Sequence, residues 1–342
     1  MVSDYASVPT LLMLGACSRS HYIRTRLHIH KRSRNVVRPF VRNPDHLFLL
    51  LKWTDSIISG STALRFMIPS TQIAWVPHDL DIYVTRQALP IIMSFLRKEG
   101  FSELRTDTSS AASNVSDTET DPDTNTTSES DYSNGTRSIA LVVKMVKDHL
   151  TVDVIQSMNT PISAVIRFHS TAVMNYITGQ GFLSAYPTIT DQNRSLINPL
   201  AFYPCLLPPS RFFPCVAKYA ERGITTCITP LDWDNETTNT ISQSSTLPGN
   251  KRHQCHISSD CPHTIRSNLD NGCLFVKFGS SHIFPDPEPI SPTMLDVKAR
   301  AGSAVWNIGG VKCYTSNAAL RPFVVSDTPE YSSLFLFFDA SH

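Results

Sequence analysis

The stretch Pro77-His78-Asp79-Leu80-Asp81-Ile82-Tyr83-Val84 decides how the rest of this chain is interpreted. Its apolar residues predict a β-strand over residues 80–85. Successive side chains of a strand point to opposite faces, so Asp79 and Asp81 share one face. Two carboxylates on one face repel each other and resist burial, and a divalent metal ion is the usual compensation. The pair is therefore a candidate magnesium or manganese site.

The segments on either side of this strand predict both helices and strands. Apolar residues at helical spacing, small-residue turns and alternating apolar runs mark where each element begins and ends. The predicted elements are a helix and short strand over residues 46–58, a helix over 62–67, a helix over 86–99 that Gly100 ends, a β-hairpin over 139–146 and 150–156, and a mostly helical segment over 161–177.

Two further features belong with the aspartate pair. Gly60 and Ser61 form a small-residue turn before a helix, and such a turn presents backbone N–H groups that suit a phosphate. Asp153 is a single acid among the apolar residues of the second hairpin strand. Three carboxylates on adjacent strands beside a phosphate-binding turn would make a two-metal phosphoryl-transfer site. Each part alone has an ordinary explanation, because Gly-Ser turns are common and exposed strands also carry acids.

The order of these motifs resembles that of a known superfamily. A Gly-Ser turn, an Asp-x-Asp strand and a lone Asp on a later strand resemble the nucleotidyltransferase superfamily of the DNA polymerase β type. More narrowly, the chain is similar to a group of uncharacterised fungal proteins that contain this domain. The resemblance covers roughly residues 45–200, and the segments that carry it are Ile58-Ser59-Gly60-Ser61-Thr62-Ala63-Leu64, Asp79-Leu80-Asp81-Ile82-Tyr83-Val84 and Phe168-His169-Ser170-Thr171-Ala172-Val173-Met174-Asn175.

This resemblance implies an α+β fold, in which a short mixed sheet with flanking helices carries the acids. By the same resemblance, Gly60 and Ser61 would hold the phosphates of a nucleoside triphosphate. Asp79 and Asp81 would ligate both metal ions, and Asp153 would ligate the catalytic metal and help to deprotonate the acceptor hydroxyl. One departure is the spacer of 17 residues between Ser61 and Asp79, which is longer than is usual in the family. We interpret the excess as a loop extension.

Other polar side chains have less distinctive settings. His169 lies between apolar residues of the predicted helical segment, where a buried histidine with one hydrogen bond is more common than a catalytic one. For each candidate phosphate-binding cation an ordinary surface charge is the more common explanation, and the candidates are Lys144, Lys147, Arg194, Lys218 and Arg222.

Composition divides the chain around a domain predicted at residues 44–200. Residues 1–43 are predicted to be a basic, poorly ordered arm, because residues 19–42 hold eight lysines and arginines and no acid. This arm could contact RNA, serve as a nuclear address, or be a solvated tail. Residues 106–136 consist mainly of Ser, Thr, Asp, Asn and Glu, which predicts an acidic disordered insert. Residues 201–342 are rich in proline and cysteine and are predicted to be less regular.

The C-terminal region contains a cluster of cysteines and histidines. Cys255, Cys261 and Cys273 lie close to several histidines. Thiolates with nearby imidazoles are ligands that Zn²⁺ prefers, so a structural zinc site is one hypothesis. Their spacing differs from the common zinc-finger patterns, and reduced, partly buried cysteines are the alternative.

Net charge, hydropathy and cysteine content limit where the protein can be located and what it can bind. The formal net charge of +1 indicates no obligatory polyanionic or membrane partner. No apolar run approaches the ~20 residues that span a bilayer. Eight cysteines in 342 residues do not indicate a secreted disulfide scaffold. These features predict an intracellular protein, cytoplasmic or nuclear.

The sequence thus favours metal-dependent transfer of a nucleotidyl group from an NTP to an acceptor hydroxyl. The acceptor could be RNA, a protein or a small molecule, and Mg²⁺ or Mn²⁺ would be the cofactor. Two alternatives stay open, namely a catalytically inactive nucleotide-binding or protein-interaction module and a zinc-stabilised adaptor. The presence of all three acids favours the enzyme.

Overall fold

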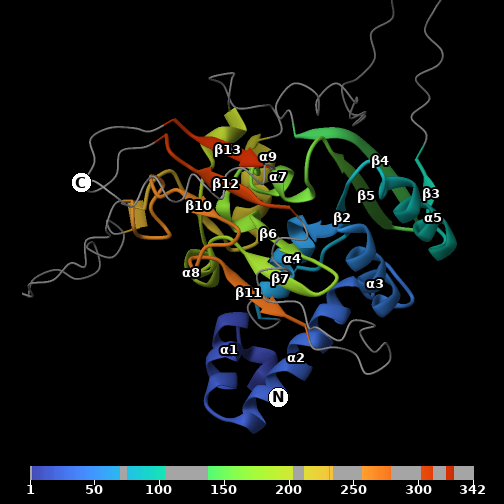
Figure 1. The fold of residues 1–342 in the computed structure, drawn as a ribbon, viewed down its shortest axis with the longest axis horizontal. Helices are drawn as coiled ribbons and strands as arrows, with labels where there is room; N and C mark the ends of the chain where they lie inside the picture. Colours follow the sequence, from blue (N-terminus) through green and yellow to red (C-terminus); the bar gives the residue numbers. More distant parts are fainter. Residues whose placement is uncertain are drawn as a thin grey trace, which may run out of the picture.

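The computed structural model describes residues 2–69, 75–104, 138–202, 212–230, 232–233, 256–278, 302–310 and 321–326. In this part of the chain the fold is α+β, and its centre is a mixed eight-stranded sheet (Figure 1). The strands of this sheet are β1 (Ile57–Ser59), β2 (Asp79–Val84), β3 (Ser102–Glu103), β4 (Ile139–Lys147), β5 (Leu150–Ser157), β6 (Asn175–Ile177), β7 (Gly181–Ser184) and β11 (Leu274–Lys277).

The strand order of the sheet is β11-β7-β6-β1-β2-β5-β4-β3. β2 and β5 run parallel, and β1 pairs with β2 in the antiparallel sense. Two smaller sheets accompany it, one from β8 (Arg194–Leu196) and β9 (Thr225–Cys227), and one from β10 (Arg266–Ser267), β12 (Ala304–Asn307) and β13 (Phe323–Ser326).

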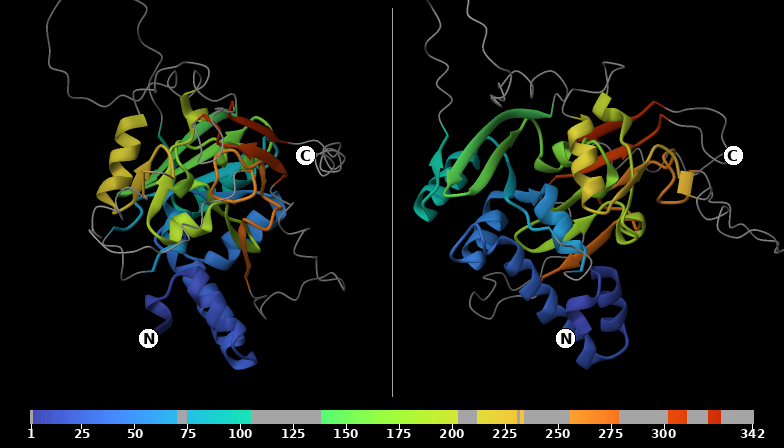
Figure 2. Two further views of the ribbon diagram at one scale, coloured as in Figure 1. Left: turned by 90° about the vertical axis from the view of Figure 1, so that its left-hand side faces the viewer. Right: turned by 180° about the vertical axis from the view of Figure 1, so that it is seen from behind.

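Helices cover the sheet and extend from it. The helices are α1 (Val8–Ala16), α2 (Arg19–Val37), α3 (Pro44–Thr54), α4 (Gly60–Met67), α5 (Leu89–Glu99), α7 (Pro161–Val165), α8 (Pro187–Asp191) and α9 (Phe212–Glu221), with 3₁₀ turns at Val2–Tyr5, Thr171–Val173 and Pro199–Phe202. The views in Figure 2 show α1 and α2 together at one end of the molecule, and Val8 and Leu11 of α1 share a buried cluster with Val276 of β11. No described helix combines the length and apolar character needed to cross a bilayer.

Most elements near the aspartates were predicted correctly. The helix, strand and second helix expected over residues 46–67 correspond to α3, β1 and α4. Gly100 ends α5 with a φ of 96°, a conformation that costs glycine little because it has no Cβ. The expected hairpin is formed by β4 and β5, and Asp148 in its turn has a φ of 52°.

The prediction of a poorly ordered N-terminal arm was wrong. Ser18 caps α2 by accepting a hydrogen bond from the backbone N–H of His21, which satisfies one of the free donors of the first turn. Thr25, Ile29 and Val37 of α2 are buried, four or eight residues apart, so they form one stripe that packs into the core. Because the other faces of α2 carry many charged residues, the composition of the segment did not reveal this buried stripe.

The prediction of a mostly helical segment over residues 161–177 was also wrong. α7 ends at Val165, and a 3₁₀ turn and strand β6 follow. The side chain of Asn198 donates to the carbonyl oxygens of Ile166 and Phe168, at 3.1 and 2.9 Å. These carbonyl groups are thus satisfied outside a helix. His169 therefore lies in a bend and not in a helix.

The C-terminal region is continuous with the sheet. β11 pairs with β7 and forms one edge of the sheet, so the sheet crosses the boundary predicted near residue 200. Arg266 is almost fully buried and forms a two-pronged ion pair with Asp270, at 2.7 and 3.0 Å. Its guanidinium also lies over the rings of Tyr186 and Trp306. The expected acidic insert at 106–136 lies outside the described residues.

Candidate functional site

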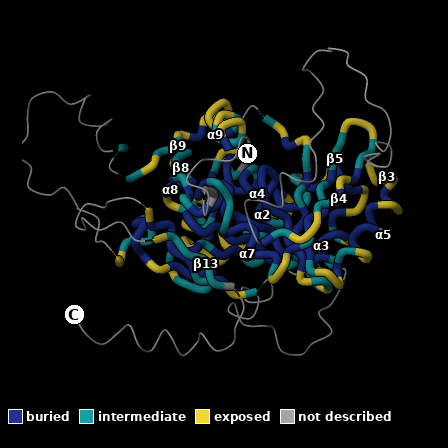
Figure 3. Tube along the Cα trace, turned by 90° about the horizontal axis from the view of Figure 1, so that it is seen from above, coloured by how far each residue is buried: buried dark blue, intermediate teal, exposed yellow. Residues whose placement is uncertain are grey.

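The three predicted acids lie on two neighbouring strands. β2 pairs with β5 so that Asp81 stands directly opposite Asp153, and Asp79 comes two residues before Asp81. The alternate residues of β2, such as Leu80 and Ile82, point into the core on the other face of the sheet. Asp79, Asp81 and Asp153 therefore share one face, as the sequence predicted for the first two. In Figure 3 the tube is mostly buried through the centre of the sheet, whereas much of α9 is exposed.

The glycine-serine turn lies directly against these acids. β1 pairs with β2 so that Ser59 stands opposite Asp81, and the chain then turns into α4. Gly60 has a φ of 65°, and a Cβ atom on it would stand 2.0 Å from Oδ2 of Asp81. The approach of backbone to carboxylate therefore requires glycine at this position.

The first residues of α4 also bind Asp79. The hydroxyl of Ser61 donates to Oδ1 of Asp79 at 2.9 Å, and the hydroxyl of Thr62 donates to the backbone oxygen of Asp79 at 3.2 Å. Although the spacer between Ser61 and Asp79 is long, the turn therefore still lies next to the acids. Thr62 was not singled out from the sequence, because a threonine in a first helical turn has no distinctive pattern.

Two of the five candidate cations lie at the acids. Nζ of Lys218, on α9, is 3.3 Å from Oδ2 of Asp79, and Nζ of Lys144, on β4, is 3.8 Å from Oδ1 of Asp153. Lys144 stands opposite Asp153 in the hairpin. The two lysines offset part of the negative charge of the three carboxylates.

The other three candidate cations make close contacts away from the acids, although the charge of Arg222 also helps to lower the pKa of Asp79. Lys147 donates to the carbonyl oxygen of Glu99 at 2.9 Å. Arg194 lies over the ring of Trp233, and Arg222 lies over the ring of Trp75 at 4.2 Å. Contacts of this kind stabilise the fold and give no evidence of phosphate binding.

The environment shifts the pKa of the three acids in different directions. Burial raises the pKa of Asp81 to about 8, and the charges of Asp79 and Asp153 add to this effect. Burial also raises the pKa of Asp153, although Lys144 opposes the shift. At Asp79 burial is outweighed by Lys218 and by the Ser61 hydrogen bond, so the pKa of Asp79 is lowered. The site therefore holds more carboxylate charge than the neighbouring cations balance.

The donor set fits a hard divalent cation such as Mg²⁺. Carboxylate oxygens are the side-chain ligands that Mg²⁺ prefers. Oδ1 of Asp153 is buried and accepts no short hydrogen bond from the described residues, with Nζ of Lys144 at 3.8 Å, so it can still act as a ligand. Among the described residues no three acidic, cysteine or histidine side chains already converge on a metal position. The site thus offers carboxylate oxygens as metal ligands and an excess of negative charge. Serine and lysine side chains hold the carboxylates in place.

His169 lies against Tyr219 of α9 and within range of the charge of Lys218. The ring of His169 is 5.6 Å from that of Tyr219, and burial together with Lys218 lowers the pKa of His169 to about 4. A neutral, largely buried imidazole agrees with the interpretation of His169 as a structural residue. Tyr219 follows Lys218 on α9 and packs with Leu64 of α4. The sequence did not single out Tyr219, since residues 201–342 were predicted to be less regular and helix α9 was not expected there.

The predicted zinc ligands are described only in part. Cys255 lies outside the described residues. Cys261 is buried, and Sγ of Cys273 lies 3.3 Å from the carbonyl oxygen of Ser267. The zinc hypothesis stays a prediction.

Comparison of the chain with protein-family models, with curated proteins and with solved structures gave no match. The residues and the geometry described above are therefore the basis for assigning a function.

Proposed function

We propose that the protein catalyses metal-dependent transfer of a nucleotidyl group from a nucleoside triphosphate to an acceptor hydroxyl, with a nucleotidyltransferase-like fold. One observation carries the proposal: Asp79, Asp81 and Asp153 share a sheet face against the Gly60–Ser61 turn. Neither an edge strand nor an ordinary hairpin explains why three carboxylates gather on one face beside a helix N-terminus, because the helix stabilises nearby negative charge but the three carboxylates still repel one another.

In this proposal each residue has a defined task. The backbone N–H groups at the start of α4, with Gly60 and Ser61, bind the triphosphate. Asp79, Asp81 and Asp153 would hold Mg²⁺ or Mn²⁺, which supplies charge neutralisation for the attacking and leaving oxygens. Lys218 offsets negative charge beside Asp79 and would also donate to a phosphate oxygen of the triphosphate.

In the proposed transfer the acceptor oxygen forms a bond to the α-phosphorus, and the bond from that phosphorus to the pyrophosphate oxygen breaks. The proton of the acceptor hydroxyl passes to Asp153. Its raised pKa makes the ionised carboxylate a stronger base than an ordinary aspartate.

A second candidate is a nucleotide-binding module without turnover. It is favoured by the lysine partners of Asp79 and Asp153, because an ammonium group at a carboxylate can replace a metal ion. Such a module would bind a triphosphate without transferring its nucleotidyl group.

The test is a label-transfer assay. The protein is incubated with each α-labelled NTP, with Mg²⁺ or Mn²⁺, and with total RNA or a protein lysate. We expect label on an acceptor for at least one nucleotide and none with the Asp79→Ala/Asp81→Ala protein. Binding without transfer would favour the inactive module, and equal transfer by the double variant would exclude these acids as the catalytic centre.

A second prediction concerns Lys218. Lys218→Gln is expected to raise the KM for the nucleoside triphosphate about tenfold, since a hydrogen bond to a charged group is worth ~1.5–3 kcal/mol. Steady-state kinetics would measure the change. Arg194→Gln is the matched control, because Arg194 was an equal candidate in the sequence but lies over Trp233. A similar KM for both variants would mean that Lys218 does not contact the nucleotide.

A further inference from the structure

The hairpin of α1 and α2 projects from one end of the molecule (Figures 1 and 2). Its turn joins Ala16, the last residue of α1, to Arg19, the first residue of α2. Every residue from 16 to 24 is exposed. The rest of the described chain therefore leaves this end open to a partner. We call residues 13–24 the hairpin tip.

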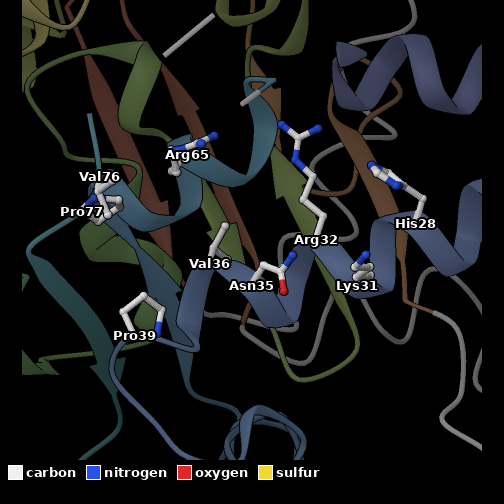
Figure 4. Close-up of a pocket in the computed structure, with 9 residues that line it drawn as sticks. All are labelled: His28, Lys31, Arg32, Asn35, Val36, Pro39, Arg65, Val76 and Pro77. Atoms are coloured by element: carbon white, nitrogen blue, oxygen red, sulfur yellow. The ribbon is translucent and has the colours of Figure 1, made fainter. Parts of the chain in front are cut away.

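The remainder of the hairpin is fixed to the body of the protein. Ile29 of α2 is buried in the core, and the guanidinium of Arg26 donates to the backbone oxygen of Phe278 at 3.2 Å. Farther along, α2 forms one wall of a cavity of about 210 Å³, and Arg65 and Pro77 lie on the opposite wall (Figure 4). The tip is therefore held in one position, so binding would not have to order it.

Large apolar side chains project at the tip. Met13 is 74% exposed, Tyr22 49% and Ile23 50%. Leu27, one helical turn after Ile23 and therefore its neighbour on the surface of α2, is 66% exposed. Single exposed apolar side chains are ordinary, whereas a group of them at one projecting end marks a surface that binds a partner or a membrane.

Cations accompany these apolar side chains. Arg19 and Arg24 are exposed at the tip, and Lys31 is exposed one turn beyond Leu27. The sequence of residues 5–44 contains no aspartate and no glutamate. The formal net charge of +1 is an average over the whole chain and does not show this local excess. Positive charge of this kind is attracted to the anionic headgroups of a bilayer.

A lipid surface accounts for the apolar side chains and the cations together. Residues 19–24 cover more than one full turn of helix and are all exposed, so the tip is convex. Segments at a membrane interface bury apolar side chains about 5–10 Å deep, and this depth would take in Met13 and Ile23. Tyr22 would lie at headgroup level, where tyrosine is enriched. A polynucleotide would contact the cations and leave the aliphatic side chains in water.

We propose that the hairpin tip inserts into the surface of a bilayer that contains acidic phospholipids. Met13 and Ile23 enter the boundary between headgroups and acyl chains, and Arg19 and Arg24 bind the anionic headgroups. This contact is peripheral and spans nothing. It is separate from the three carboxylates, so it holds whether or not the protein transfers nucleotides.

The test is co-sedimentation of the full chain with vesicles of phosphatidylcholine and phosphatidylserine, in EDTA and at physiological salt. We expect Met13→Gln/Ile23→Gln to weaken binding to the vesicles about tenfold, because two apolar side chains no longer enter the interface. The matched control is Ile91→Gln/Met158→Gln, which makes the same changes at exposed positions outside the hairpin. This control should bind like the unaltered protein.

The cations are tested in the same assay. Arg19→Gln/Arg24→Gln should also weaken binding about tenfold, and the unaltered protein should bind vesicles of phosphatidylcholine alone far more weakly. Arg86→Gln/Lys98→Gln is the matched control, since it removes the same charge from exposed positions outside the hairpin.

Insertion itself has a spectroscopic readout. The new tryptophan of Tyr22→Trp should be quenched by brominated phosphatidylcholine in the mixed vesicles, and that of Ile91→Trp should not. The proposal is overturned if the unaltered protein does not bind the mixed vesicles, if it binds phosphatidylcholine alone equally well, or if the control pairs lose as much binding. Loss in the arginine pair with undiminished binding by Met13→Gln/Ile23→Gln would also overturn it, because the tip would then bind polyanions such as nucleic acid without insertion.

Discussion

Asp81→Asn is expected to abolish nucleotidyl transfer and, at the same time, to make the metal-free protein more stable. The two effects have one origin, because Asp81 lies between Asp79 and Asp153 and its charge is unfavourable unless a cation binds there. Loss of a metal ligand should remove several kcal/mol of transition-state stabilisation, or ~10³-fold in rate or more. Asparagine keeps the shape of the side chain and removes its charge.

The stability gain should depend on pH in a definite direction. The pKa of Asp81 is raised from an unfolded value of about 4 to about 8 in the folded protein. The folded state therefore holds the proton more tightly, and ionisation costs stability increasingly as the pH rises through this window. Asp81→Asn should have no stabilising effect through this group below pH ~4, and its largest effect, on the order of a few kcal/mol, above the folded pKa.

Denaturant unfolding in EDTA across this pH range measures the effect, and the label-transfer assay measures activity. Asp148→Asn is the matched control: Asp148 is exposed in the β4–β5 turn, where its φ of 52° also suits asparagine. A variant that keeps its activity, or that is less stable than the unaltered protein at high pH, would contradict the role given to Asp81.

Gly60→Ala should damage activity far more than it damages stability. The new Cβ would stand 2.0 Å from Oδ2 of Asp81, so the carboxyl group must rotate away from its neighbours. A side-chain rotation costs the fold little, but it removes Asp81 from the site. We expect a loss of transfer comparable to that of Asp81→Asn, with a cost in unfolding free energy of about 1–2 kcal/mol from the positive φ.

Gly223→Ala separates the effect of the positive φ from the effect of the contact with Asp81. Gly223 also has a positive φ, of 82°, but a Cβ there would meet nothing within 4 Å. Its replacement should lower stability to a similar extent and leave transfer unchanged. Equal activity of the two variants would mean that the contact between Gly60 and Asp81 is not needed for catalysis.

The sequence predicted those parts of the site that depend on local pattern. The two-residue period of a strand places Asp79 and Asp81 on one face, and the turn residues define the hairpin that carries Asp153. The parallel pairing of β2 with β5 and the contact between Lys218 and Asp79 join distant segments, and no local period encodes such contacts. Helix α2 was missed for another reason, since its buried stripe is narrow and the rest of its composition is rich in charge.

The pairing of β11 with β7 has a consequence for how the protein is made. β11 comes from residues 274–277 and Lys218 from α9, so both the edge of the sheet and the counter-charge of Asp79 come from late parts of the chain. During synthesis the three acids emerge from the ribosome well before either. The nascent chain therefore carries Asp79 without its counter-charge until Lys218 arrives. It also carries an open strand edge, which is a template for aggregation, until residues 274–277 arrive.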